Sequence, residues 1–464
     1  MTPVARPFRV LRSKPLWISN GVIVGLLAML FAVFYIGANI DPAGHMRHLP
    51  VGLVNADKGA TVGGEHVNLG SQITESIEKS KASGDKIEWK VMGENELKKE
   101  MGKGKLYGAL VVPADFSTSV TALTTSSSGT PVRPALKVLT NQSAGSLGSG
   151  LARQVTTTAA HSASVSVGKK LTAQVEAAQA KAAKAAKATK GKGAKETKGK
   201  GVQYRAAASQ TPLPAAARLL LADPAAVQIE DGHPLDSHSG MGLTAFYYAL
   251  VLVVCGMLSA NVISGQVDHA LGYTHSDIGP LRKHNPLVRA TRVQTLAMSS
   301  TLVIGLSVVM ASLVMAGAIG IMGMDASHLP LLWLYSVAAI AVCGIGALAL
   351  LAVFGTPGML LVTLFYIAMA VPTAGATTPV QALPGFYRFL AEFEPLRQIT
   401  GGVRSILYYD AQGDAGLTRG WVMIGVGLLV ACLFGFGMTR FYDRKGLHRI
   451  PHEDREPERA AVPA

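Results

Sequence analysis

Uncharged apolar stretches of membrane-spanning length constrain the fold of this chain more than any other feature. A helix of about 20 apolar residues crosses the hydrocarbon core of a bilayer. Six stretches qualify, and none of them contains Asp, Glu, Lys, Arg or His: 16–40, 240–264, 295–324, 330–354, 357–373 and 420–438. The sequence therefore predicts a polytopic α-helical membrane protein with six transmembrane helices, one followed by five. The first stretch far exceeds the apolar run of about 7–15 residues in a signal peptide, so we interpret it as an uncleaved anchor rather than a leader.

Basic residues flank the predicted spans on one side only. Three clusters occur: Arg6, Arg9, Arg12 and Lys14; Arg282, Lys283, Arg289 and Arg292; Arg440, Arg444, Lys445 and Arg449. Lys and Arg concentrate in cytoplasmic loops, and with six spans all three clusters fall on the same face. We therefore expect a multi-pass plasma-membrane protein whose N-terminal residues 1–15 and tail 440–464 are cytoplasmic. Residues 41–238 and 374–419 are then extracytoplasmic, and the membrane domain covers 239–439.

An α/β pattern follows the first span, over residues 41–140. Strands are predicted at 49–55, 86–92, 106–112 and 134–140, and helices at 69–81 and 94–101. Alternation of this kind favours a small sheet covered by helices. The sequence does not decide whether the sheet has four strands or more.

Residues 141–238 change composition to Ser, Ala, Gly and Thr, and then to Ala and Lys. The spacing predicts a helical stalk over 145–190, followed by a Gly-Lys linker. Residues 168–205 hold ten Lys, one Arg and two Glu, which is +9 of the formal charge of +14. Because the charge is local, we expect no nucleic-acid partner. The tract is either a solvated spacer or a contact for anionic polymers and lipid headgroups.

Catalytic and metal-binding patterns are weak throughout the sequence. It contains no GxxxxGK[ST], GxSxG or HExxH string, and we expect neither an enzyme nor a cofactor. Polar residues that could suggest a site are better explained as turn formers or helix starts: Asn55, Asp57, Lys58 and Asp115. A metal site is a minor alternative to a loop for a second set: Asp231, His233, Asp236 and His238, with His269 and His275 equally weak. The three cysteines lie in apolar spans: Cys255, Cys343 and Cys432.

Three motifs in the correct order resemble a known family. VGLVNADKGA (51–60) and LYGALVVPADFS (106–117), with the polar exit at Asn141, resemble the start of a large ectodomain. The segment 374–410 resembles a Pro-rich external re-entrant segment, with these residues in the expected order: Pro379, Leu383, Pro384, Phe386, Pro395, Arg404 and Tyr408. Together they resemble the type-2 ABC exporter permeases, in particular the YhgE/phage-infection-protein (Pip) branch. The resemblance implies a permease for an amphiphilic or envelope-related substrate, with a separate ABC ATPase subunit and a second permease copy, as a homodimer or a paired permease.

Two sets of residues are candidates for this function. The first would gate or line a substrate path in the external segment: Glu392, Glu394, Pro395, Arg397 and Arg404. These charges could equally be mutually paired surface groups. The second would contact an ATPase in the cytoplasmic loop 265–292: Asp277, Arg282 and Lys283. The alternative function is a non-transporting envelope protein, such as a receptor, phage-attachment point or secretion-associated scaffold, whose ectodomain binds a wall component or partner.

Overall fold

The computed structural model of the 464-residue chain has two compact units. The helical unit comprises 1–46, 145–147 and 235–464, and the α/β unit comprises 47–144 and 148–234. The structure describes residues 14, 18, 22, 29, 33–34, 37–38, 41–62, 65–79, 85–125, 133–190, 223–235, 238–274, 276–278, 281–283, 285–447 and 449. The Gly-Lys linker and most of the first predicted span therefore lie outside the described residues.

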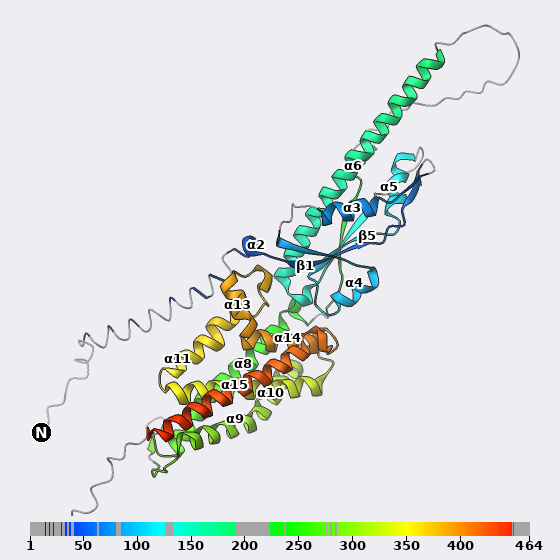
Figure 1. Ribbon diagram of the computed structural model, residues 1–464. Coiled ribbons are helices and arrows are strands. Elements are labelled where there is room, and N and C mark those ends of the chain that lie inside the picture. The colour runs from blue at the N-terminus through cyan, green and yellow to red at the C-terminus, as the bar shows by residue number, and fades with distance from the viewer. Residues whose placement is uncertain are drawn as a thin grey trace, which may run out of the picture. The chain divides into compact units, whose positions relative to one another are not determined.

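The α/β unit is built on a five-stranded sheet of order β4-β1-β5-β6-β7 (Figure 1). Its strands are β1 (Leu49–Asn55), β4 (Ile87–Val91), β5 (Gly108–Val112), β6 (Ala135–Thr140) and β7 (Ala226–Asp231). Neighbouring strands are parallel, except that β5 and β6 are antiparallel. A separate hairpin pairs β2 (Ala60–Val62) with β3 (Glu65–Val67).

Helices cover both faces of this sheet, which explains why the central strands are apolar throughout. They are α3 (Leu69–Glu78), α4 (Glu94–Met101), α5 (Phe116–Thr125) and α6 (Ser146–Lys190), with a 3₁₀ turn, η3 (Gln142–Ala144), before α6. Every residue of β5 is buried. One core joins the sheet to α3, α5 and α6, and a second core joins the other face to α4 through Leu97 and Met101. A strand buried on both sides reads as a continuous apolar run rather than an alternating one.

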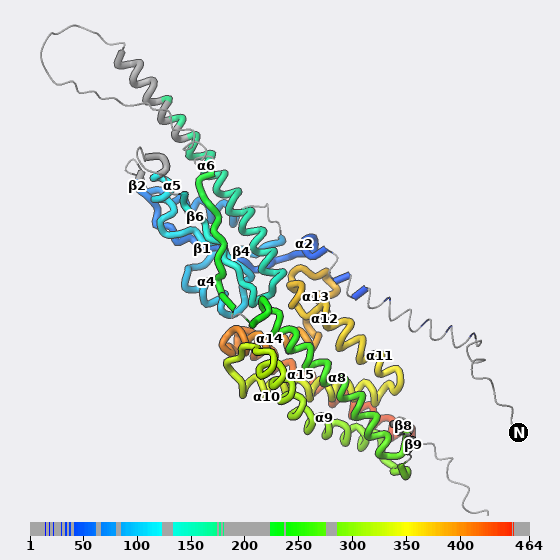
Figure 2. Tube along the Cα trace, turned by 180° about the vertical axis from the view of Figure 1, so that it is seen from behind, coloured from blue at the N-terminus to red at the C-terminus, as the bar shows by residue number. Residues whose placement is uncertain are grey.

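The four predicted strands and both predicted helices of this unit are present, and α5 begins directly after Asp115, which the sequence indicated as a helix start. The fifth strand, β7, was not predicted. It lies in 141–238, the region that the sequence analysis divided into stalk and linker, and it pairs with β6 in parallel register from Ala135–Ala226 to Thr140–Asp231. Figure 2 shows β7 running beside β6 and the lower part of α6. The long helix also contributes Ala160, Ala163 and Val167 to the core of the α/β unit.

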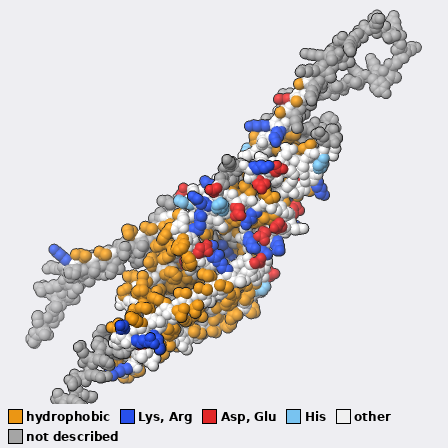
Figure 3. All heavy atoms as spheres, viewed as in Figure 1, with side chains coloured by type: hydrophobic (Ala, Val, Ile, Leu, Met, Phe, Trp, Pro, Cys, Tyr) orange, Lys and Arg blue, Asp and Glu red, His pale blue; other side chains and the backbone are white. Residues whose placement is uncertain are grey.

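The helical unit contains, among the described residues, four helices long and apolar enough to cross a membrane. They are α8 (Thr244–Ala270), α9 with its π-helical continuation η5 (Arg292–Met315 and Ala316–Ile321), α10 (Leu329–Phe354) and α15 (Leu417–Arg444). Figure 3 shows the broad apolar belt over these helices. These helices coincide with four of the predicted spans, with ends that differ by up to six residues, and the chain is a membrane-embedded protein.

The remaining two predicted spans differ from this pattern. Residues 357–373 form a shorter apolar segment of three pieces, α11 (Gly358–Thr363), the π-helical η6 (Leu364–Met369) and α12 (Ala370–Thr373). It falls short of the about 20 residues that a straight span needs. Only eight residues from Lys14 to Ala38 are described before α2 (Pro42–His45), and of these Phe34 and Ala38 are buried against Leu383 and Tyr387.

One end of the helical unit gathers the start of α9 and the ends of α8 and α15. The Asp443 carboxylate accepts hydrogen bonds from the backbone N–H groups of Arg292 (3.0 Å) and Val293 (3.1 Å), so α15 caps α9. Arg449, just beyond α15, forms a two-pronged ion pair with Asp268 in the last turn of α8. Two of the three basic clusters therefore contribute residues to the same end of the helices.

Candidate functional site: an apolar cavity with a polar roof

A cavity of about 690 Å³ opens among the apolar helices of the helical unit. Its walls come from α10, the α11–η6 segment and α15. Its roof comes from α13 (Gly385–Phe393) and α14 (Pro395–Tyr408), through Phe393, Pro395, Gln398 and Ile399. The lining described by the structure includes no charged side chain. Ligand pockets in proteins have volumes of about 300–1,000 Å³ and mostly apolar linings, so this cavity has the size and character of a ligand site.

Several side chains of the lining are exposed. These are Phe354 (45%), Leu361 (36%), Phe393 (61%), Val426 (45%), Val430 (58%) and Phe434 (36%). All six are apolar and belong to α10, α11, α13 or α15, so the exposed part of the lining is apolar.

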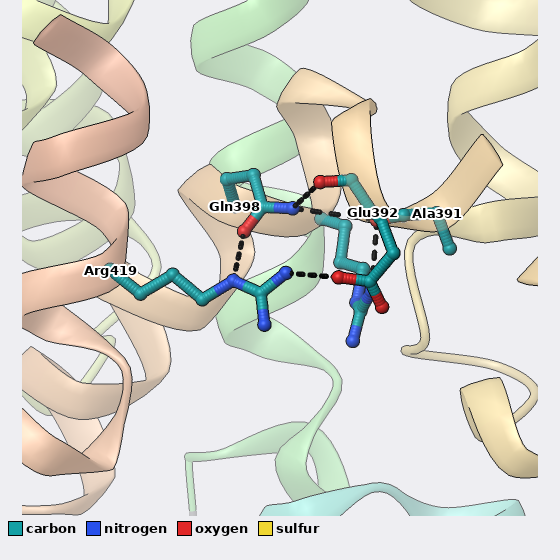
Figure 4. Close-up of polar contacts among 5 residues, drawn as sticks. Ala391, Glu392, Gln398 and Arg419 are labelled. Carbon is teal, nitrogen blue, oxygen red and sulfur yellow. Dashed lines mark hydrogen bonds and ion pairs between the residues drawn. The ribbon is translucent and has the colours of Figure 1, made fainter. Parts of the chain in front are cut away.

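Charged residues form a network on the roof, around Glu392 (Figure 4). One carboxylate oxygen accepts from Arg397 Nη1 at 3.0 Å, and the other accepts from Arg419 Nη2 at 2.6 Å. Partial burial acts to raise the pKa of Glu392, but hydrogen bonds from Arg419 and Arg397 outweigh it, so the pKa lies below its ordinary value. Glu392 is therefore ionised, and the three groups together carry a net charge of +1.

Gln398 connects this network to the cavity that it lines. Its Oε1 accepts from Arg419 Nε at 2.9 Å, and its Nε2 donates to the Glu392 carbonyl at 2.9 Å. The Arg419 guanidinium is thus one hydrogen bond away from the cavity lining. About half of the Glu392 and Arg419 side chains remains exposed, at 49% and 51%. The arrangement presents an apolar chamber beside a half-exposed cationic group.

Glu394 has a different role from its neighbour two residues away. Its two carboxylate oxygens accept from the backbone N–H groups of Leu396 and Arg397, each at 2.9 Å, and cap the N-terminus of α14. The residue is only 2% exposed. Burial raises its pKa to about 7, against the opposing effects of these two hydrogen bonds and of the Arg397 charge. Pro395 occupies the first helical position, where its missing N–H costs nothing.

Close backbone packing holds α14 against the membrane helices. The Tyr335 side chain of α10 is fully buried, and a Cβ added at Gly402 of α14 or at Gly420 of α15 would overlap its hydroxyl. Its ring packs edge to face on Trp421, with centroids 5.2 Å apart. Only glycine at these two positions lets the three helices meet around the tyrosine. The roof is therefore fixed to the walls at a defined place.

Not all of the candidate residues come together at this site. Arg404 lies two turns beyond Arg397 on α14, near Tyr408, whose hydroxyl accepts from the Ala245 N–H at 3.1 Å. A separate hairpin of β8 (Ser276–Ile278) and β9 (Leu281–Lys283) contains Asp277, Arg282 and Lys283. Asp277 lies opposite Arg282 in the strand register. These three residues are remote from the roof in sequence and belong to the loop between α8 and α9.

The turn residues of the α/β unit are structural, and Asp57 does more than form a turn. Its carboxylate accepts from the N–H groups of Gly59 (3.2 Å), Gly70 (2.9 Å) and Ser117 (3.0 Å), and from the Ser117 hydroxyl. Asn55 Oδ1 accepts from the Asp57 N–H at 3.1 Å. The buried Asn141 donates from Nδ2 to the carbonyls of two residues, Met101 (2.9 Å) and Leu106 (2.8 Å). Through these hydrogen bonds Asp57 and Asn141 connect segments of the α/β unit that are far apart in sequence.

The weak metal candidates do not form a cluster among the residues that the structure describes. Asp231 accepts from the Thr140 hydroxyl at 2.7 Å, and His238 approaches Asp325 at 3.8 Å. His269 lies within 3.3 Å of the Thr274 carbonyl. No group of three His, Cys, Asp or Glu with metal-binding geometry occurs within the described ranges. Asp236 and His275 lie outside the described residues.

Two residues of the site, Gln398 and Arg419, were missed by the sequence analysis. Arg419 lies directly before the predicted span 420–438, and Gln398 lies directly after the candidate residue Arg397. The two missed residues are 21 positions apart in sequence. The sequence does show that Arg419 is a cation next to an apolar stretch and that Gln398 follows Arg397. It does not show that Arg419 and Gln398 contact each other.

Comparisons with known proteins identify a family without a known activity. Residues 20–427 match the family described as "Protein of unknown function (DUF3533)". Comparison with curated proteins gave no match, and comparison with solved structures gave none either. The matched range includes the α/β unit, the roof and nearly all of the cavity lining. Because it covers most of the chain, this protein belongs to the DUF3533 family.

Proposed function

We propose that this chain is the permease subunit of an ABC-type-2-like exporter that moves an amphiphilic or envelope-related substrate outward. The observation that carries the proposal is the apolar cavity of about 690 Å³ among membrane-length helices, roofed by a partly exposed ion network. An amphiphile needs both environments at once, an apolar chamber for its tail and a polar rim for its head. The resemblance of the sequence motifs to the YhgE/Pip branch supports the same function.

The proposed topology has six spans in a plasma membrane, with both termini in the cytoplasm. Residues 16–40 and 357–373 would complete the set begun by α8, α9, α10 and α15. The basic clusters support it, because Arg292 and Arg449 contact residues at the common end of α8, α9 and α15. The α/β unit would then lie outside the cell, as would the roof of the cavity.

Energy for export would come from a separate subunit, since the chain has no phosphate-binding loop. The β8–β9 hairpin, with Asp277, Arg282 and Lys283, is the proposed contact for an ABC ATPase on the cytoplasmic side. A second permease copy, identical or paired, would complete the path. This chain itself would be no enzyme and would need no cofactor.

A cavity-filling substitution tests the proposal. Ala431 lines the cavity on α15, and A431W would fill much of the space, whereas Leu433 on the same helix is 67% exposed and outside the lining. The measurement is the outward movement of a fluorescently labelled phospholipid in cells that express the wild type, A431W or L433W. We expect A431W to abolish the transport gained with the wild type and L433W to retain it. Equal transport with and without the protein would count against an exporter.

The α/β unit favours a second candidate function, a receptor or scaffold of the envelope. It has its own cores on both faces of its sheet, as an independent binding domain would. In this case the membrane helices would only anchor it, and neither tryptophan substitution would matter. Capture of a wall polymer by cells displaying the full chain, unaffected by A431W, would support this function over export.

A further inference from the structure

We propose that the cavity and the Glu392–Arg397–Arg419 network form one binding site for an acidic phospholipid of the surrounding bilayer. The acyl chain would occupy the cavity, and the anionic headgroup would bind the two guanidinium groups of the roof. This inference rests on the proposed function and names its substrate class. It commits to a lipid that enters from the bilayer rather than an amphiphile from solution.

The tail site is argued from the cavity lining and its opening. Among the described lining residues the polar groups are few: the Cys343 thiol, the Tyr366 hydroxyl and the Gln398 amide. Lining residues such as Phe393 and Val430 are apolar and exposed, and the acyl chain would enter beside them from the bilayer. An acyl chain gains little by leaving hydrocarbon for another apolar chamber, so the tail supplies fit rather than selectivity. Selectivity must come from the roof.

The head site is argued from charge and hydrogen-bonding geometry. Arg397 and Arg419 both donate to Glu392, and two cations with one anion leave a charge of +1 beside the chamber. A guanidinium binds phosphate through two parallel hydrogen bonds, and such charge-assisted bonds are roughly twice as strong as neutral ones. Arg419 also donates to Gln398, which lines the cavity, so head and tail sites adjoin.

Glu392 acts in this arrangement as an internal competitor of the headgroup. Its carboxylate holds the two guanidinium groups in the empty site, and a phosphate must displace it from at least one of them. Half of its side chain is exposed, so it can move toward water. Removing its charge should therefore tighten the binding of an anion, whereas removing the charge of Arg419 should weaken it. A purely structural network would be harmed by both changes.

The test uses the full chain in nanodiscs and two lipids with identical acyl chains, phosphatidylglycerol and phosphatidylcholine. Native mass spectrometry counts the lipid that remains bound, and the variants are R419Q, E392Q, A431W and R440Q. Arg440 is an exposed arginine near the other end of α15 and serves as the charge-matched control. Both lipids carry the same phosphodiester, but the choline ammonium would lie beside a site of net charge +1, so we expect the wild type to prefer phosphatidylglycerol by about tenfold. R419Q should abolish the preference, E392Q should increase it, A431W should reduce binding of both lipids, and R440Q should leave both unchanged.

Three outcomes would overturn the inference: equal retention of the two lipids by the wild type, loss of preference in R440Q as well as R419Q, and weaker phosphatidylglycerol binding in E392Q. Capture of dodecyl sulfate from solution without retention of phosphatidylglycerol would also contradict a bilayer source. Should R419Q fail to fold, E392Q decides alone: a stronger preference for phosphatidylglycerol supports the inference, and a weaker one contradicts it. This binding test and the export assay are independent. Selective lipid binding without export would support the lipid site and contradict the exporter.

Discussion

Asp57 and Ser117 are joined by two hydrogen bonds although 60 residues separate them in sequence. The Ser117 N–H donates to Asp57 Oδ1 at 3.0 Å, and its hydroxyl donates to Oδ2. The same hydroxyl accepts from the N–H of Leu69 at 2.8 Å. One serine thereby links the end of β1, the N-terminus of α3 and the N-terminus of α5. Both residues belong to motifs that the sequence analysis singled out, and the structure explains why they occur together.

Replacing Ser117 by alanine should destabilise the α/β unit by about 1–3 kcal/mol, because the buried Leu69 N–H loses its acceptor and Asp57 loses a donor. Amide hydrogen exchange of the full chain in detergent checks this, through faster exchange in 69–78. The matched control is S119A, since Ser119 makes only a 3.5 Å contact to the exposed Asp115. Equal exchange in S117A and S119A would contradict the expectation.

Adding a methyl group at Gly402 should destabilise the helical unit by about 1–3 kcal/mol, the usual cost of overpacking. The new Cβ would overlap the hydroxyl and ring of Tyr335, which is fully buried and has nowhere to move. Gly401 provides the control, because a Cβ there meets nothing within 4 Å. The measurement is the thermal midpoint in detergent, which should fall for G402A and stay within about a degree for G401A.

A double-mutant cycle identifies the cause of that loss. In a Y335L background the ring that would collide is gone, so G402A should then cost much less than in the wild type. An undiminished cost in that background would place the strain elsewhere on α14.

The sequence predicted the local elements of this protein well, because each depends on a short pattern. Strand β1 at 49–55 and helix α4 at 94–101 have the predicted bounds. Strand β7 was not predicted, because it forms by pairing with β6, whose residues lie more than 80 positions earlier in the sequence. Its pattern also places Gln228 and Glu230 among its six residues, and a short edge strand of this kind looks like a loop.

The site was predicted only in part, for a related reason. Glu392 and Arg397 are five residues apart, and their pairing was foreseen as an alternative to a role in transport. Arg419 reaches the same carboxylate from α15, 27 residues away, because the chain between α14 and α15 returns to the roof. No local pattern encodes that return. The need for glycine at Gly402 and Gly420 could not be predicted either, because it arises from contact with Tyr335 on a third helix.

The proposed topology predicts opposite labelling of two positions with similar exposure. Ile229 of β7 is 50% exposed and Leu447, beyond α15, is 54% exposed. In a background without Cys255, Cys343 and Cys432, a membrane-impermeant maleimide should label I229C in intact cells. It should label L447C only after permeabilisation, because the positive-inside rule places the end of α15 in the cytoplasm. Labelling of L447C in intact cells would reverse the orientation.

Stability of the helical unit should depend on pH through Glu394. Burial raises its pKa to about 7 from an ordinary value of 4.5. The folded state therefore binds more protons than the unfolded state between these values, and stability decreases as pH rises. The contribution is complete below about pH 4.5, amounts to about 3 kcal/mol at 1.36 kcal/mol per pKa unit, and is lost as pH rises through 7.

The neighbours of Glu394 bear on this pH window in different ways. The charge that faces Glu394 is that of Arg397, which favours the ionised form of the carboxyl, and burial outweighs it. Glu392 cannot produce the same slope, because its pKa is lowered and its contribution is lost only as pH falls below about 4.5. Histidines also change charge between pH 5 and 8, so Glu394 is identified by comparing the wild type with E394Q over this range.

E394Q is the decisive variant, since the amide keeps an oxygen to cap α14 but cannot ionise in this range. The thermal midpoint of the wild type should fall between pH 5 and 7 and level off above pH 7, and that of E394Q should lack this decrease. E392Q, which removes the neighbouring carboxylate, should keep the wild-type slope. Parallel curves for wild type and E394Q would show that Glu394 is already ionised at pH 5, and that its two backbone hydrogen bonds outweigh the cost of its burial.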